Sequence, residues 1–328
     1  MAERRGSGLQ ILPHGFKSRL HLHTLSVKTS RATLAIDIGA TKIAIAIADQ
    51  DLRFVHRRTI LIADSSDLTR DFHREVLGIV SNSSFAVSGI GIASAGPINR
   101  ASGVISPVNI PAWRDFNVVA SVQEILPEIP ISFLQDAVAV AYAEKRIGAG
   151  VDFQHMLGMV VSTGVGGGLI LNNEIFHGEL GNAGFFGHHS IDFNGALCRC
   201  ARLGCVESIS SGPSMVDFAR ESGWAGPANF ESLSESARAG DQTALAAIDR
   251  GTRGLAVGIL NTLAILDISA VVVGGGVSFA GDVFWRPFHA HLKNEFQHMT
   301  LSREPIVVPA KLAKDAGLLG AALSAKTQ

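Results

Sequence analysis

The chain has 328 residues, which is long enough for two domains that each bury a core. Hydrophobic residues make up 47% and charged residues 17%, a composition typical of a soluble α/β enzyme and unlike that of a disordered or fibrous protein. The formal net charge of −1 gives no electrostatic reason to expect nucleic acid or an anionic membrane as a partner. The longest apolar stretch, residues 255–266, is too short to span a membrane and predicts a buried helix.

Residues 1–30 differ from the remainder, because basic side chains outnumber acidic ones there and no secretory-type apolar run is present. An organelle transit peptide has such a bias. A flexible tail, or translation from an upstream start codon, explains the excess of basic residues as well, and we favour this second interpretation. We therefore expect a disordered leader.

The first half of the chain predicts strands joined by short turns. Residues 33–48 are typical of strand, tight turn and strand, and residues 53–61 predict a third strand. Residues 67–80 have helical spacing with Asp67 as N-cap. An apolar strand follows over residues 86–93.

The second half repeats this order of strands followed by helix. Residues 131–134 predict a short strand, and Asp136 opens a helix that ends near Ile147. Strands are expected at residues 156–161 and 168–171, on either side of a glycine loop over residues 162–168. The remaining elements are expected as helices after the cysteine-rich segment, notably 243–266, then a strand at 271–273 and a final helix at 315–325. Two such series of strands and helices indicate two related α/β halves.

Three glycine-rich turns each follow an apolar strand, at residues 39–42, 162–168 and 274–276. Backbone N–H groups at such turns bind phosphate, and glycine allows the phosphate to come close. None of them matches the P-loop or the dinucleotide-binding fingerprint. Asp37, just before the first turn, could hold Mg²⁺, so the turns predict a nucleotide site.

All three cysteines fall in one segment, together with two adjacent histidines. His188 with Cys198, Cys200 and Cys205 is a complete tetrahedral set for a structural zinc ion. Three reduced thiols near a turn are the plain alternative, which we consider less favoured. If all three cysteines bind a metal ion, no cysteine is available for a disulfide, which indicates a reducing, cytoplasmic location.

Two acidic residues have two possible roles each. Asp136 stands at a strand-to-helix junction, where an isolated Asp is usually an N-cap, but it could instead be a general base. Glu207 could be a helix-start acid or a ligand to a sugar hydroxyl. Spacing leaves both questions open.

In their order, these motifs resemble the ROK family of sugar kinases, repressors and uncharacterised reading frames. The resemblance covers residues 33–325, through LAIDIGATK, LQDAVAVAYAE, STGVGGG, GHHSIDFNGALCRCARLGCVE and VVVGGGVS. It implies the actin-like, ribonuclease H-like ATPase fold, with two α/β domains around a cleft. Residues 31–134 with 312–326 would form a small N-terminal domain, and 135–311 a large domain with a zinc loop at 181–207. A homodimer that binds sugar and Mg-ATP is also implied.

The resemblance assigns roles to individual residues. Asp136 becomes the base that activates a sugar hydroxyl. The residues at ATP and Mg²⁺ are Asp37, Gly39, Thr41, Lys42, Thr163, Gly164, Gly166, Gly167, Gly168, Gly275 and Gly276. The residues at the sugar are Gly96, Asn109, Gln135, Asp136, His188 and Glu207, and the zinc ligands are His188, Cys198, Cys200 and Cys205.

Three positions depart from the family pattern. Gln135 replaces an asparagine, Ala201 replaces a glycine of the zinc loop, and Phe185 replaces a glutamate that grips sugar hydroxyls. Loss of that carboxylate removes a charge-assisted hydrogen bond, which we expect to be costly in glucose-specific members. Because bacterial N-acetylmannosamine kinases tend to lack the same glutamate, the resemblance argues against a glucokinase and implies an N-acylated sugar, beside whose acetamide an aromatic ring could pack.

Within the family the chain most resembles the bacterial N-acetylmannosamine kinases of sialic acid breakdown, which phosphorylate the 6-hydroxyl. Alternative readings are another hexose kinase, such as a glucokinase or allose kinase, a decayed kinase, or a sugar-sensing regulator. The leader is too short for the DNA-binding domain of such a regulator.

Overall fold

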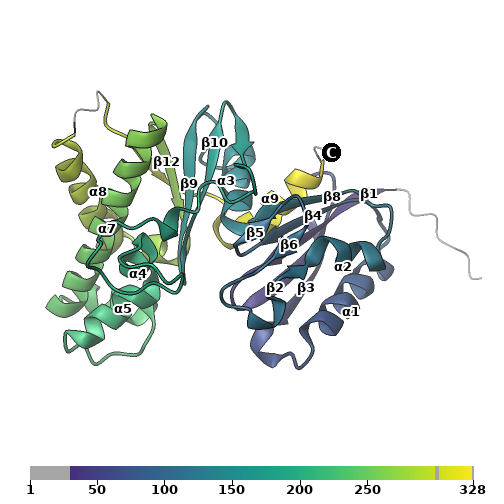
Figure 1. Cartoon of the computed structure of the whole chain (residues 1–328), viewed down its shortest axis with the longest axis horizontal. Helices are drawn as coiled ribbons and strands as arrows, with labels where there is room; N and C mark the ends of the chain where they lie inside the picture. The colour runs from purple at the N-terminus through teal and green to yellow at the C-terminus, as the bar shows by residue number, and fades with distance from the viewer. Residues whose placement is uncertain (1–29, 300–302, 327–328) are drawn as a thin grey trace, which may run out of the picture.

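Two five-stranded sheets carry the fold of this computed structural model, which describes residues 30–299 and 303–326 (Figure 1). The first sheet has the order β3-β2-β1-β4-β8 and the second β11-β10-β9-β12-β13. The strands are β1 Arg31–Ile38, β2 Lys42–Ala48, β3 Phe54–Leu61, β4 Ala86–Ser94, β8 Ile131–Gln135, β9 Met156–Val161, β10 Val165–Leu171, β11 Glu174–Phe176, β12 Ala270–Gly274 and β13 Ile306–Pro309. β5 Ile98–Asn99, β6 Val104–Ile105 and β7 Phe116–Asn117 form a small third sheet. The expected leader, apart from Ser30, lies outside the described residues.

The two large sheets repeat one topology. In the first, β1, β2 and β3 pair antiparallel, and β4 and then β8 add in parallel beside β1. In the second, β9, β10 and β11 pair antiparallel, and β12 and then β13 add in parallel beside β9. The prediction of two related α/β halves is therefore confirmed, and the doubled arrangement is that of the actin-like fold.

The helices cover the sheets and fill the space between them (Figure 1). They are α1 Leu68–Ser81, α2 Val118–Ile125, α3 Asp136–Ile147, α4 Val206–Ser210, α5 Gly212–Glu221, α6 Phe230–Arg238, α7 Gln242–Leu266, α8 Asp282–Phe296 and α9 Ala316–Lys326. The Asp67 side chain caps α1 by accepting a hydrogen bond of 3.0 Å from the Arg70 N–H, as predicted. The apolar stretch 255–266 lies inside α7, and no helix of the described chain is long and apolar enough to cross a membrane.

Helices α3 and α9 pack closely together because small residues line their contact. A side chain at Gly320 of α9 would collide with the backbone of Ala139 in α3. One at Gly91 of β4 would collide with the carbonyl group of Ala321 in α9. The first residues of α3 and of α9 consequently reach the same cleft between the sheets. We propose the domain boundaries stated above, with α9 returning to the first sheet.

Glu144 connects the end of α3 to the segment that enters α9. Its side chain is buried, with the residue 1% exposed. The carboxylate accepts hydrogen bonds from the backbone N–H groups of Ala149 at 2.7 Å, Lys311 at 3.2 Å and Leu312 at 2.8 Å. Three backbone donors at one buried carboxylate fix how the chain crosses between the two sheets.

We expect Glu144→Gln to lower the free energy of unfolding by about 1–3 kcal/mol, because an amide nitrogen then faces backbone N–H groups that it cannot accept from. Urea denaturation measures this change. Glu124→Gln, on an exposed position of α2, is the matched control and should change stability by less than about 0.5 kcal/mol. Equal effects of the two substitutions would show that the hydrogen bonds of Glu144 do not contribute to the free energy of unfolding.

The glycine loop predicted over residues 162–168 is shorter than expected. β10 begins at Val165, so Gly166, Gly167 and Gly168 are strand residues. A Cβ at Gly167 would lie 2.9 Å from the Cβ of Phe186, and one at Gly168 would lie 2.8 Å from the Cβ of Ala141. Close packing therefore requires glycine at these two positions. The sequence alone does not distinguish a glycine required for packing from one in a phosphate-binding turn.

Candidate active site

A cleft of about 500 Å³ lies between the two large sheets and receives residues from both. Of the residues predicted at ATP, Mg²⁺ or sugar, it brings together Asp37, Gly39, Thr41, Gly96, Asn109, Gln135, Asp136, Thr163, Gly164, Gly166, His188, Glu207, Gly275 and Gly276. Lys42, Gly167 and Gly168 are not among its lining residues. Lys42 closes the first turn through its carbonyl oxygen, which accepts a 3.0 Å hydrogen bond from the Gly39 N–H.

Asp37 and Asp136 line the cleft together with two further acids, Glu144 and Glu207. Burial and the negative charge of Asp136 together raise the pKa of Asp37 to about 7, although the positive charge of Lys42 opposes the shift. Burial likewise raises the pKa of Asp136 to about 6, against a hydrogen bond from the Ala137 N–H at 2.7 Å. Two interacting carboxylates with raised pKa values suit cation binding and proton transfer near neutral pH.

Asp136 is the first residue of α3, whereas the N-cap position belongs to Gln135. The usual structural role of an isolated Asp at such a junction therefore does not explain this carboxylate. A side chain at Gly317, near the start of α9, would collide with the Asp37 carboxylate. Asp136 is thus placed by the start of α3, whereas Asp37 comes from β1 and its carboxylate lies against the start of α9.

Glu207 is placed for both of the roles that the sequence left open, a helix-start acid and a ligand to a sugar hydroxyl. It lies in the first turn of α4 and also lines the cleft. Its Oε2 accepts a 2.9 Å hydrogen bond from the Val165 N–H, which holds the second glycine turn. Its Oε1 lies 3.9 Å from His188 Nε2.

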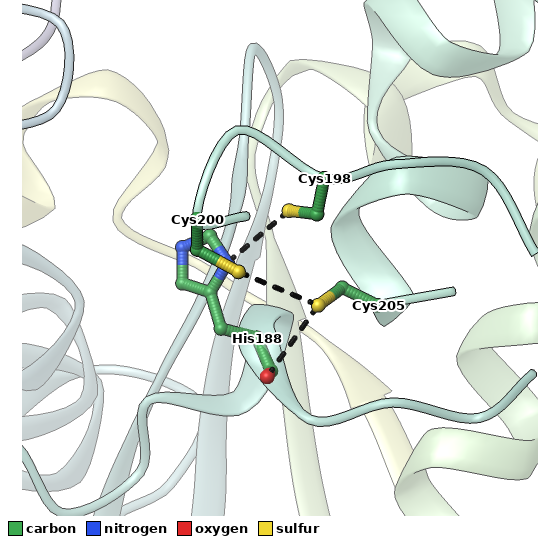
Figure 2. A group of neighbouring side chains, drawn as sticks. All are labelled: His188, Cys198, Cys200 and Cys205. Carbon is green, nitrogen blue, oxygen red and sulfur yellow. Dashed lines mark hydrogen bonds between the residues drawn. The ribbon is translucent and has the colours of Figure 1, made fainter. Parts of the chain in front are cut away.

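His188 and the three cysteines converge in one loop, as Figure 2 shows. Their ligand atoms all lie within 4.8 Å of one another. His188 Nδ1 is 3.5 Å from Cys198 Sγ, and Cys200 Sγ is 3.6 Å from Cys205 Sγ. One imidazole and three sulfurs at this spacing fit a tetrahedral zinc ion.

The neighbouring residues agree with His188 as the ligand. His189 is turned away, with Nδ1 2.7 Å from the carbonyl oxygen of Phe186. Ala201, where the family pattern has glycine, adopts a φ of 69° and still leaves the four ligand atoms together. A left-handed alanine is unfavourable, so glycine would suit this position better.

Two contacts attach the loop to the first half of the chain. The Asn182 side chain accepts from the Ile98 N–H at 3.0 Å and donates to the Ile98 carbonyl oxygen at 2.7 Å. Arg199, between two of the cysteines, donates from Nη1 to Asn109 Oδ1 at 3.0 Å and lines the cleft. Sequence reasoning missed both pairs, because no periodicity relates residues so far apart in the chain. It also missed Lys314, which brings a positive charge to the cleft from the segment before α9.

A hollow of about 550 Å³ adjoins the cleft and shares Ser162, Thr163, Gly276 and Phe279 with it. Its further lining includes Phe230, the first residue of α6, and Gly212, the first residue of α5. The cleft and this hollow together offer space for an elongated ligand that runs past the second and third glycine turns.

The sequence model of the ROK family matches residues 33–328. The chain belongs to the ROK family. Its curated relatives include an N-acetylmannosamine kinase of Haemophilus influenzae, 32% identical over 292 residues, which are 88% of this chain and 93% of the relative. An N-acetylmannosamine kinase of Yersinia pestis is 33% identical over 303 residues, 90% of this chain and 98% of the relative.

The fold agrees with this family. A ROK glucokinase of Streptomyces griseus, solved with glucose and AMPPNP, has a TM-score of 0.77 and 28% identity. The match covers 90% of this chain and 100% of the glucokinase chain. The predicted actin-like ATPase fold is confirmed for this ROK protein.

Proposed function

We propose that this ROK protein is an ATP-dependent kinase that transfers a phosphoryl group to the 6-hydroxyl of N-acetylmannosamine. The observation that carries the proposal is Asp136, an acid with a raised pKa at the junction of β8 and α3, inside a cleft between the two halves. The kinase relatives named above, aligned over most of their length, support the substrate.

The proposed chemistry assigns one proton transfer to Asp136. Its carboxylate accepts the proton of the attacking hydroxyl as the oxygen forms a bond to the γ-phosphorus, and the bond to the β-γ bridging oxygen breaks with ADP as leaving group. A pKa of about 6 leaves the carboxylate largely ionised at neutral pH and close enough to that pH to accept a proton.

The glycine turns support a site for the phosphates of ATP. The turn at Gly39–Thr41 comes from the first half, and the turns at Thr163–Gly164 and Gly275–Gly276 come from the second. Backbone N–H groups at such turns bind phosphate oxygens, and Asp37 would hold Mg²⁺, which neutralises charge on the transferred group. Burial of the Asp37 carboxylate favours its protonated form without a cation, so a bound cation would stabilise the ionised form.

For the cysteine cluster we propose a structural zinc ion with no open coordination position. It would hold the loop 181–207 so that His188 Nε2 faces the cleft beside Glu207. The use of reduced thiols as metal ligands supports a cytoplasmic location. We keep the homodimer as a prediction of the family resemblance.

The experiment that tests the proposal presents Mg-ATP with N-acetylmannosamine, glucose, N-acetylglucosamine or allose and measures ADP release by a coupled assay. We expect kcat/KM to be highest for N-acetylmannosamine. Preference for glucose would refute the specificity for N-acetylmannosamine and favour the alternative function, a ROK glucokinase. Absence of turnover with every sugar would refute the kinase.

A further inference from the structure

The Arg199 side chain joins the two halves of the chain at Asn109. Arg199 lies in the loop 181–207, whereas Asn109 belongs to the first half, 90 residues earlier. Nη1 of Arg199 donates a 3.0 Å hydrogen bond to Oδ1 of Asn109, and both residues line the cleft. An arginine of the second half thus contacts a residue that the family resemblance places at the sugar.

The direction of this hydrogen bond fixes how the Asn109 amide is turned. A guanidinium can only donate hydrogen bonds, so the amide atom that faces Arg199 must be the oxygen. The amide nitrogen, Nδ2, then points away from Arg199, and none of the described residues accepts a hydrogen bond from it. Asn109 therefore presents an amide donor at the cleft, and the ligand group that suits this donor is an acceptor, such as the oxygen of a sugar hydroxyl.

The backbone on each side of the contact is held by other interactions. Ile110, which is 1% exposed, anchors the segment that carries Asn109. The Cys198 carbonyl oxygen accepts a 2.9 Å hydrogen bond from the Ala201 N–H and so closes the turn that carries Arg199. The Asn109 residue itself is exposed, so its side chain would rotate without a partner. The guanidinium limits that rotation and reduces the entropy that sugar binding must cost.

We propose that Arg199 is a positioning residue for sugar binding, which holds the Asn109 amide so that Nδ2 can donate to the sugar. Arg199 acts through Asn109, so loss of the guanidinium weakens sugar binding and leaves the binding of ATP unchanged. The inference rests on the proposed function, because the sugar that Asn109 contacts is the substrate of that function.

The test combines Arg199→Met and Asn109→Ala in a double-mutant cycle, with isothermal titration of N-acetylmannosamine as a readout that needs no turnover. We expect Arg199→Met to weaken binding about 3- to 10-fold and Asn109→Ala about 10-fold. In the Asn109→Ala background, Arg199→Met should add less than about a 2-fold effect, because its partner is already missing. Arg286→Met, at an α8 side chain that is 83% exposed, is the matched control and should bind the sugar like the wild type.

Steady-state kinetics distinguish positioning from direct contact with phosphate. In Arg199→Met, KM for N-acetylmannosamine should rise about 3- to 10-fold, while KM for ATP and kcat change less than about 2-fold. Arg199→Lys keeps a charged donor on a shorter side chain and should recover part of the sugar affinity. A larger rise in KM for ATP than for the sugar would show that Arg199 contacts phosphate directly and would overturn the proposal.

The double-mutant cycle also separates this inference from the proposed function. If the wild type binds and phosphorylates N-acetylmannosamine while the effects of the two substitutions multiply, Arg199 does not act through Asn109, and the proposed function stands. If the wild type neither binds nor phosphorylates N-acetylmannosamine, the proposed function fails and this inference fails with it.

Discussion

Asp136→Asn is expected to lower kcat by about 10²- to 10⁴-fold, the usual contribution of a general base. The substitution preserves size and a hydrogen-bonding oxygen, but an amide cannot accept the hydroxyl proton. Affinity for N-acetylmannosamine and ATP should change only a few-fold, because the other lining residues of the cleft remain. Coupled ADP release gives kcat, and isothermal titration gives the two affinities.

The pH profile provides an independent check of the same residue. Because the pKa of Asp136 is raised to about 6, protonation at lower pH removes the base, and kcat/KM of the wild type should fall as pH drops through about 6. The variant should lose the part of this acidic limb that Asp136 causes and keep the part that protonation of Asp37, with its pKa raised to about 7, causes. Asp282→Asn, at a side chain that is 91% exposed, is the control and should keep both rate and profile. An Asp136→Asn enzyme with more than a tenth of wild-type kcat would exclude Asp136 as the base.

Cys205→Ser is expected to abolish stoichiometric zinc binding and to raise KM for the sugar about 10- to 100-fold, the usual cost of disturbing the surroundings of a metal site. Cys205 is fully buried, and its Sγ lies 3.6 Å from Cys200 Sγ, so serine removes one of four converging ligands. His188, another of the four, lines the cleft, which links metal loss to sugar binding. Metal analysis of purified protein and initial-rate kinetics measure the two effects.

Asn194→Ala, on an exposed residue of the same loop, is the matched control and should keep both zinc and KM. Full zinc content in Cys205→Ser would rule out the four-residue site. Zinc loss with an unchanged KM would separate the metal from the sugar pocket and contradict the proposed role of the loop.

Local features of the fold were predictable from the sequence because they depend on neighbouring residues. The β1–β2 hairpin follows from β-branched residues around one turn, and Asp67 caps the helix that its spacing predicted. The cysteine cluster was predictable for the same reason, since a metal loop brings together residues that are close in the chain.

Contacts between distant segments were beyond sequence reasoning. Arg199 and Asn109 are 90 residues apart, and Glu144 and Leu312 are 168 apart. Each pair depends on how the two halves are placed, which no local pattern records. Phe185 was recognisable as a departure from the family, but its position beside Gly96 and Gln135 comes only from the structure.

The repeated topology has a consequence for how ligands leave. The β1–β2 turn and the β9–β10 turn occupy equivalent places in the two sheets, and both line the cleft. A polyphosphate bound by both turns would connect the two halves, so we expect its release to require that the halves move apart. The Arg199–Asn109 and Asn182–Ile98 hydrogen bonds resist that separation from the side of the metal loop. We therefore expect substitutions at the contact between the halves, and not only at the phosphate turns, to change the rate of nucleotide release.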